Sequence, residues 1–218
     1  MVEYWKQIIT DCWDIYKNNY RLLLSAHCIL ILLYIYPQFV ITNIDLNENL
    51  FNLAEAMSPS VAILCISLFL LNGGISLGAI FLSHNAILKK DLDFKQLFQH
   101  FYLLPQLILK YMVSGITMLS ALYFFSNIIF ASLVFVVMNF SLFFFYDYII
   151  VIKKLDFKSA IQENFNLVSK NIILISQYCL LSLLITLSLS ILPILGIVLG
   201  QSFIMVLGIQ FYRKLSVK

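Results

Sequence analysis

Long apolar runs alternate with short polar stretches along the chain, and most of the runs have the length of a membrane-spanning helix. A span needs about 20 mainly apolar residues. The sequence therefore predicts an all-α integral membrane protein in which residues 1–218 form a single polytopic domain. Six transmembrane helices are expected, at about 22–41, 61–87, 111–126, 128–152, 171–192 and 194–212.

Two pairs of neighbouring spans are separated by only a short turn. The apolar run 111–152 carries a single charge, Asp147, and as one helix it would be about 63 Å long, roughly twice the thickness of a hydrocarbon core. We therefore expect this run to fold back on itself, with the turn at Ser126–Asn127. Pro193 is expected to separate the last two spans, because proline interrupts a helix.

A lysine-rich phrase occurs twice between the apolar runs, as KKDLDFK at 89–95 and as KKLDFK at 153–158. The paired lysines indicate a membrane edge. Asp93 and Asp156 then stand where a helix N-cap is expected, since an N-cap carboxylate accepts backbone N–H bonds. Gln96 occupies the position that would complete a capping box with Asp93.

Three polar segments are amphipathic, and each is too polar to cross a membrane. We predict interfacial helices at about 3–20, 93–109 and 156–169, lying in the headgroup layer with the aromatic face toward the lipid. The segments open with YWKQ, DFKQ and DFKS, which favours a unit of one interfacial helix and two spans used three times. The alternative is that similar loops arose separately at a similar membrane edge.

Composition and charge support this topology. Hydrophobic residues make up 61 % of the chain and charged residues 11 %, against about 45–50 % and about 25 % in soluble domains, which excludes a water-soluble globule. With six spans the basic residues all fall on one side, whereas the opposite loop 42–60 carries Asp45, Glu48 and Glu55 and no Lys or Arg. The positive-inside rule then places both termini in the cytoplasm. These basic residues are Lys6, Lys17, Arg21, Lys89, Lys90, Lys95, Lys110, Lys153, Lys154, Lys158, Lys170, Arg213, Lys214 and Lys218.

A few polar residues inside the spans are the candidates for a site. Asp147 and Lys110 lie toward the cytoplasmic ends of antiparallel neighbours, so a structural ion pair is expected. A proton or ligand site is the alternative, because an intramembrane carboxylate is a functional hypothesis by default. A polar cavity shared by Asp147, Asn72 and His84 would indicate a functional site, whereas a sealed bundle would indicate a scaffold.

Small residues recur one helical turn apart in two of the spans. Gly74 and Gly78 form one such pair, and Gly196 and Gly200 form the other. This spacing lets helices approach closely, so we expect helix packing at both places. The alternative is a kinked helix that lines a groove for a lipid or a substrate.

No catalytic, cofactor-binding or metal-ligating constellation can be assigned. The histidines are not clustered, no serine has a GxSxG-like setting, and the chain has no glycine-rich phosphate loop. A protein that is not an enzyme and has no cofactor is therefore expected. The net charge of +3 and the absence of a dense basic run argue against a nucleic-acid partner.

Several stretches resemble a known family: AMSPS and NGGISLGAI around the second span, LLPQLIL before the third, and FKSAIQENFNLVSKNIILI before the fifth. The chain resembles the YciC-like inner-membrane proteins of enteric-type bacteria and, more distantly, the membrane domain of glycerophosphodiester phosphodiesterases. This resemblance implies a six-span plasma-membrane protein and brings no catalytic residues with it.

Two functions are suggested by these patterns. The first is a role in envelope or membrane-lipid organisation in the bacterial inner membrane, with anionic headgroups at the cytoplasmic face as partners. The second is a small transporter or permease-like subunit that moves a lipid or small amphiphile and has an unidentified membrane partner.

Overall fold

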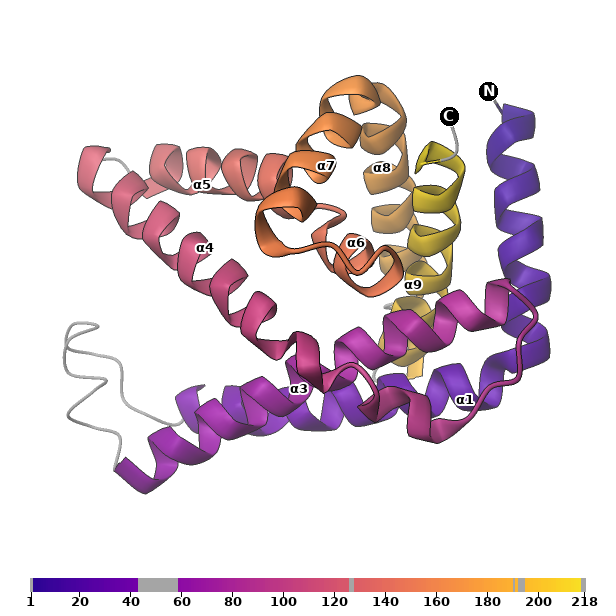
Figure 1. The fold of residues 1–218 in the computed structure, drawn as a ribbon, viewed down its shortest axis with the longest axis horizontal. Helices are drawn as coiled ribbons and strands as arrows, with labels where there is room; N and C mark the ends of the chain where they lie inside the picture. Colours follow the sequence, from indigo (N-terminus) through magenta and orange to yellow (C-terminus); the bar gives the residue numbers. More distant parts are fainter. Residues whose placement is uncertain (1, 43–58, 126–127, 190, 192–194, 217–218) are drawn as a thin grey trace.

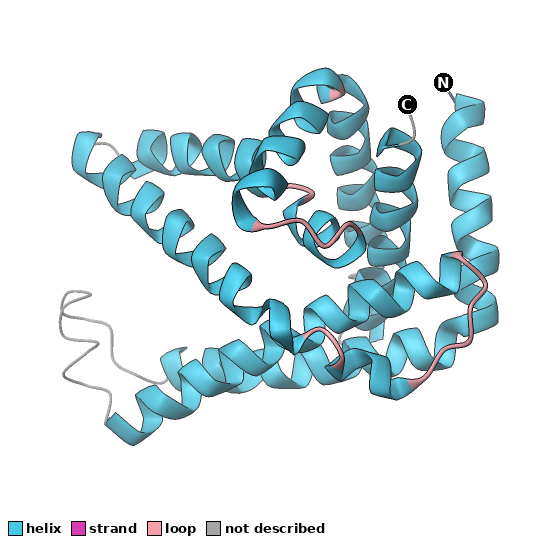
Figure 2. Cartoon of the chain, viewed as in Figure 1, coloured by secondary structure: helices cyan, strands magenta, loops and turns pink. Residues whose placement is uncertain are grey.

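The structure is a computed structural model that describes residues 2–42, 59–125, 128–189, 191 and 195–216. These residues form helices joined by short turns, and no strand occurs among them (Figure 2). The α-helices are α1 (Val2–Thr42), α3 (Pro59–Ile87), α4 (Leu104–Phe124), α5 (Ile128–Phe143), α6 (Tyr146–Ile152), α7 (Phe157–Lys170), α8 (Ile172–Leu189) and α9 (Leu195–Ser216), and two 3₁₀ turns, η1 (Phe94–Phe98) and η2 (Phe101–Leu103), precede α4.

The helices run in several directions around a shared interior (Figure 1). The first part of α1 runs beside α9 and α8, and the second part of α1 runs beside α3. Helices α4 and α5 form a V-shaped hairpin that projects away from the other helices (Figure 1). The first part of α1 and the last part of α9 lie near each other, and Lys214 Nζ of α9 is 3.8 Å from Asp11 Oδ2 of α1.

Five helical segments of the described chain are long and apolar enough to cross a membrane, so the protein is an all-α, multi-pass membrane protein. The last predicted span, 194–212, forms α9, a helix of 22 residues with a length of about 33 Å. Much of α9 is buried against the other helices, including Val206, Leu207 and Tyr212. The five segments are Glu3–Ile35, Pro59–Ile87, Phe94–Phe124, Ile128–Ile152 and Ile172–Leu189.

The predicted break between an interfacial helix at 3–20 and a span at 22–41 is wrong, because α1 is continuous through both. The helix bends sharply instead (Figure 1). Asn19 Nδ2 donates to the carbonyl of Ile15 at 2.9 Å, and Ser25 Oγ donates to that of Leu22 at 2.9 Å. Side chains that bond their own helix backbone in this way bend a helix.

The first part of α1 buries much of its aromatic face against protein. The ring centroids of Trp5 and Phe211 are 5.3 Å apart, and those of Tyr16 and Phe203 are 5.9 Å apart. Trp5 Nε1 also donates to Gln177 Oε1 of α8 at 2.9 Å. The face predicted to enter the headgroup layer therefore packs largely on α8 and α9, a tertiary contact that periodicity alone does not reveal.

The single interfacial helix predicted at 93–109 is also wrong. The segment forms η1 and η2, and the α-helix begins only at Leu104, where Pro105 fits the first turn because that turn needs no N–H donor. A helix is present where the third interfacial helix was predicted, at 156–169, as α7 with Ala160, Asn164 and Val168 on its buried face; its position at the membrane interface stays a prediction.

Both lysine-rich phrases form the predicted turn and cap. Lys89 and Lys154 adopt left-handed backbone conformations, with φ of 54° and 55°, and each is the second residue after its helix, α3 or α6. Asp93 accepts a bond from Lys95 N at 3.0 Å, and Asp156 Oδ2 accepts one from Ser159 N at 3.4 Å. Hydrogen bonds from the Ser159 side chain and backbone hold the pKa of Asp156 below its ordinary value.

The capping box expected at Gln96 does not form. Gln96 Nε2 donates to the carbonyl of Asp91 at 3.0 Å, and Gln96 Oε1 accepts from Asn85 Nδ2 at 3.2 Å, so the side chain ties the end of α3 to the following turn. The turn and cap occur in both lysine-rich phrases but not in α1. The predicted threefold repeat stays a prediction. The turn at 126–127, Pro193 and most of loop 42–60 lie outside the described residues.

Candidate functional site

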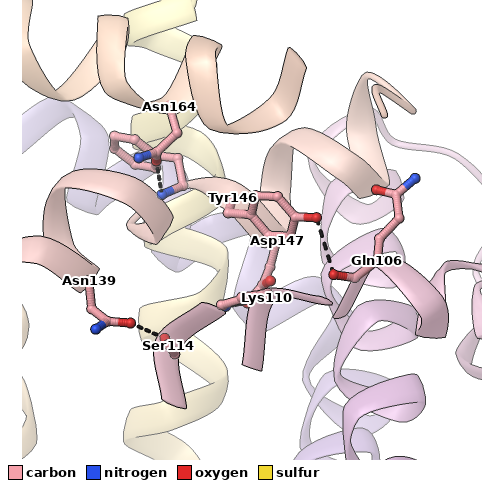
Figure 3. Close-up of polar contacts among 8 residues, drawn as sticks. Gln106, Lys110, Ser114, Asn139, Tyr146, Asp147 and Asn164 are labelled. Atoms are coloured by element: carbon pink, nitrogen blue, oxygen red, sulfur yellow. Dashed lines mark hydrogen bonds and ion pairs between the residues drawn. The ribbon is translucent and has the colours of Figure 1, made fainter. Parts of the chain in front are cut away.

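The predicted span 128–152 is interrupted, and the interruption is held by a side chain from α7. Helix α5 ends at Phe143 and α6 begins at Tyr146. The buried side chain of Asn164 accepts a bond from Phe145 N at 2.6 Å (Figure 3). It also donates to the carbonyl of Ser141 at 2.7 Å. Backbone groups released inside an apolar region need such partners, so Asn164 stabilises the break.

The break directs Asp147 toward α4, where it meets Lys110. Lys110 Nζ is 2.7 Å from Asp147 Oδ2, and the two side chains are 15 % and 31 % exposed. The other carboxylate oxygen, Oδ1, is buried with no hydrogen-bond partner in the described part of the chain. Lys110 Nζ also lies 5.8 Å from the ring centroid of Tyr146. The structure therefore brings together the pair that the sequence singled out.

This ion pair belongs to a longer line of polar contacts, which we call the polar seam (Figure 3). Ser114 Oγ donates to Asn139 Oδ1, and Asn139 Nδ2 lies 3.4 Å from Thr117 Oγ1. At the other end, Tyr146 OH donates to the carbonyl of Gln106 at 3.3 Å. The seam consists of Gln106, Lys110, Ser114 and Thr117, one helical turn apart on α4, with Asn139, Tyr146 and Asp147 facing them.

Most of the seam has no clear signal in the sequence. In the sequence, Asn139 and Ser114 are isolated polar residues within apolar runs. Asn164 is one of several polar residues of an amphipathic helix. The spacing of Gln106, Lys110 and Ser114 by four residues is the signal that points to one helix face. Only the fold shows what that face meets.

The first predicted glycine pair, Gly74 and Gly78, permits close packing of α3 against the 3₁₀ turns η1 and η2. A Cβ on Gly78 would overlap the backbone carbonyl of Leu97, and a Cβ on Gly74 would lie 2.7 Å from the ring of Phe101. Gly200 faces Leu189 of α8, and Gly196 is buried.

One glycine that the pattern did not single out is as tightly enclosed as these. A Cβ on Gly208 would lie 2.5 Å from Tyr148 OH and 2.8 Å from Tyr178 OH. Gly208 thus lets α9 approach the tyrosines of α6 and α8.

The remaining polar candidates lie apart from the seam. Asn72 Nδ2 donates to the carbonyl of Leu30 in α1 at 2.9 Å. His84 is partly buried, and it lies near the positive charges of Arg213 and Lys90. Asn72 lines a hollow whose described lining includes neither Asp147 nor His84.

Several hollows carry polar groups outside the seam, and two of them combine residues of α1 with residues of α3 or of the turn after it. The first, the rim pocket, has a volume of about 590 Å³ and lies between α1 and the turn after α3, with Arg21 and Lys90 in its lining. The second, the His27 groove, has a volume of about 560 Å³ and lies between α1, α3 and α9, with His27 and Asn72 in its lining. Within the described residues, no group of three or more His, Cys, Asp or Glu could hold a metal ion.

No protein-family model, curated protein or solved structure matches the chain. The resemblance to the YciC-like family accordingly stays a prediction, and a functional proposal has to rest on the geometry of the molecule.

Proposed function

We propose that the protein is a non-enzymatic, six-span protein of the bacterial inner membrane that organises membrane lipid. Its basic rim faces the cytoplasm and binds anionic headgroups. In this proposal α9 is the sixth span, and the YciC-like family is the one to which the chain is related. The rim pocket, with Arg21 and Lys90 in its lining, is the observation that supports the proposal most.

The distribution of charge supports the orientation. Lys89, Lys90, Lys153 and Lys154 are exposed in the two turns that follow α3 and α6. Lys214 near the end of α9 approaches Asp11 in the first part of α1, which supports placing the basic residues of these two segments on the same side. Such a one-sided rim is attracted to the anionic cytoplasmic leaflet by about 1 kcal/mol per basic residue near the surface.

The rim pocket has the chemistry for a phosphate-bearing headgroup. A guanidinium donates two parallel hydrogen bonds to phosphate oxygens, and an ammonium adds a point charge. Arg21 Nε donates to Tyr20 OH at 3.3 Å, and both residues line the pocket. Asn18 adds an amide, and Asp91 borders the same pocket and limits the excess of positive charge. Basic pockets between transmembrane helices bind headgroups in this way.

Lipid retention tests this proposal. The full-length protein in nanodiscs of phosphatidylglycerol and phosphatidylethanolamine is released into the gas phase, and its bound lipids are counted by native mass spectrometry. We expect the double variant Arg21→Gln, Lys90→Gln to retain less phosphatidylglycerol than the wild type. The matched control Lys17→Gln, Lys158→Gln removes two exposed basic residues outside the pocket and is expected to retain more than the first variant. Equal losses in the two variants would contradict a specific rim pocket.

The polar seam favours a second candidate function, a permease-like subunit that moves a lipid or small amphiphile. A line of hydrogen-bonding groups along an otherwise apolar hairpin gives a polar headgroup partners inside the membrane. The substitution Asp147→Asn distinguishes a structural role of the Lys110–Asp147 pair from a role in transport. A structural pair predicts lower accumulation of the protein in the membrane, whereas a transport role predicts normal accumulation with loss of lipid flux in proteoliposomes.

A further inference from the structure

The His27 groove contains a buried histidine with an unused hydrogen-bonding atom. His27 is 3 % exposed, and its Nδ1 lies 2.9 Å from the carbonyl oxygen of Leu23. Its Nε2 is buried with no hydrogen-bond partner in the described part of the chain. Buried polar atoms are nearly always satisfied by protein, water or ligand, so an orphan nitrogen on a side chain that lines a hollow points to a partner.

The tautomer of His27 follows from its bond to Leu23. A carbonyl oxygen only accepts, so Nδ1 carries the proton of the neutral ring. Nε2 is then an acceptor, and its partner must be a donor such as a hydroxyl. Asn72, Ser76 and Gln201, which also line the groove, provide amide and hydroxyl groups around the same hollow.

The rest of the lining restricts the partner to a neutral, largely apolar molecule. Most of the lining surface is apolar, with Leu30, Ile31 and Met205 contributing to it, and no Lys, Arg, Asp or Glu occurs among the described lining residues. A charged headgroup would find no counter-charge there, and an uncompensated charge inside a membrane protein is unfavourable. The volume of about 560 Å³ lies within the range of about 300–1,000 Å³ typical of small-molecule sites.

We propose that the His27 groove binds a neutral lipid alcohol, with the hydroxyl donating to His27 Nε2 and the hydrocarbon chain lying along the aliphatic lining. The site is separate from the rim pocket and takes an uncharged ligand, so it does not depend on the proposed binding of anionic headgroups. The lining residues of α1 and α3 lie in segments that are long and apolar enough to cross a membrane, so a ligand dissolved in the bilayer would reach the groove without passing through water.

Photolabelling tests this proposal on the full-length protein in nanodiscs. The probe is hexadecanol with a diazirine in its chain and a terminal alkyne, and the matched control probe is its methyl ether, which lacks the hydroxyl donor. We expect the alcohol to label the groove segments of α1, α3 and α9, and excess hexadecanol to compete for that labelling. Loss of one hydrogen bond corresponds to about a fivefold loss of affinity, so the ether should label about fivefold less.

Variants assign the labelling to His27. His27→Phe keeps a ring but removes the acceptor. We expect the alcohol probe to label this variant about as weakly as the ether probe labels the wild type. His27→Gln retains an acceptor and should recover much of the labelling. Ser76→Phe fills the groove from α3 and should block labelling while His27 stays in place. The rim variant Arg21→Gln, Lys90→Gln should label like the wild type, which separates this site from the rim pocket.

Two outcomes would overturn the proposal. Equal labelling by the alcohol and the ether on the wild type would show that no hydroxyl is recognised, and this comparison holds even where a variant fails to fold. Labelling of folded His27→Phe and Ser76→Phe at the wild-type level would show that the probe binds elsewhere. Folding of each variant is checked by size-exclusion chromatography and thermal unfolding.

Discussion

The α4–α5 hairpin and the interior where α3, α6, α7 and α9 meet are built on different principles. In the interior Phe145, Tyr146, Phe211 and Tyr212 are almost completely buried, and the ring of Phe145 contacts the rings of Phe211 and Tyr212. In the hairpin most large apolar side chains are exposed, as with Leu119 at 69 %. The hairpin legs are instead joined by small buried residues, such as Ala121 and Ala131, and by the polar seam.

This difference follows from the solvent of each region. Lipid is as apolar as leucine, so burial of leucine gives little driving force between two helices inside a bilayer. Polar contacts and close approach of small residues then contribute more to the association of α4 with α5. The interior, in contrast, excludes both lipid and water and gains from dense packing of large rings. The hairpin and the interior should therefore respond to opposite kinds of substitution.

The largest effect is expected from Gly78→Val, which breaks the packing of the interior. The new side chain overlaps the backbone carbonyl of Leu97, which cannot move away as a flexible side chain would. We expect a loss of about 3 kcal/mol or more in the free energy of unfolding, measured by unfolding in mixed micelles. Gly115→Val in the hairpin is the matched control, because a Cβ on Gly115 meets no atom within 4 Å. A similar loss in the two variants would contradict the contrast between the regions.

Asn164→Leu should have the next largest effect, because it removes the partner of two backbone groups at the α5–α6 break. Leaving a buried backbone group unsatisfied costs about 1–3 kcal/mol, so we expect a loss of about 2–3 kcal/mol in the unfolding free energy. Asn166→Leu, on the exposed face of the same helix, is the control and should change it by less than about 0.5 kcal/mol. An unchanged stability of Asn164→Leu would show that the break needs no partner.

A smaller effect is expected from the Lys110–Asp147 pair, whose side chains are partly exposed. Lys110→Met leaves Asp147 unpaired and should lower the unfolding free energy by about 1–2 kcal/mol. The double variant Lys110→Met, Asp147→Leu removes both charges and should be closer to the wild type than Lys110→Met is. A double-mutant cycle measures the coupling, and a coupling near zero would contradict the structural role of the pair.

The smallest effect concerns the cap of α7 and appears as a dependence on pH. The pKa of Asp156 is lowered in the folded protein, so its contribution to stability is fully present above the unfolded-state value of about 3.9 and is lost as pH falls toward the folded-state value. Asp156→Asn keeps a capping oxygen but does not titrate. The wild type should therefore lose slightly more stability than Asp156→Asn when the pH falls below about 4. Parallel stability curves for the two proteins would contradict this role.

Local signals in the sequence predicted local structure well. The lysine-rich phrases did mark helix ends, and Asp93 and Asp156 do cap the helical turns directly after them, because these features depend on residues within one turn. The placement of most apolar helices could be predicted from composition in the same way. The predicted helix at 93–109 failed because the backbone of Leu97 packs against Gly78, a contact between segments that periodicity cannot show.

The site was predictable only in part, for a similar physical reason. Lys110 and Asp147 stood out because an ion pair inside apolar runs is unusual. The break after Phe143 depends on Asn164, and the orphan atom of His27 depends on the arrangement of α1, α3 and α9. Contacts of this kind join residues far apart in the chain, so they become visible only in the folded molecule.

The most direct measurement of the central claim is the position at which an anionic lipid contacts the protein. Phosphatidylglycerol with a photoreactive group next to its phosphate is incorporated into nanodiscs with the wild-type protein, and the crosslinked residues are mapped by mass spectrometry. The proposed function predicts crosslinks concentrated at Asn18–Leu22 and Lys90–Leu92, around the rim pocket. Crosslinks spread evenly along the exposed apolar surface of α4 and α5, with none at the rim pocket, would contradict it.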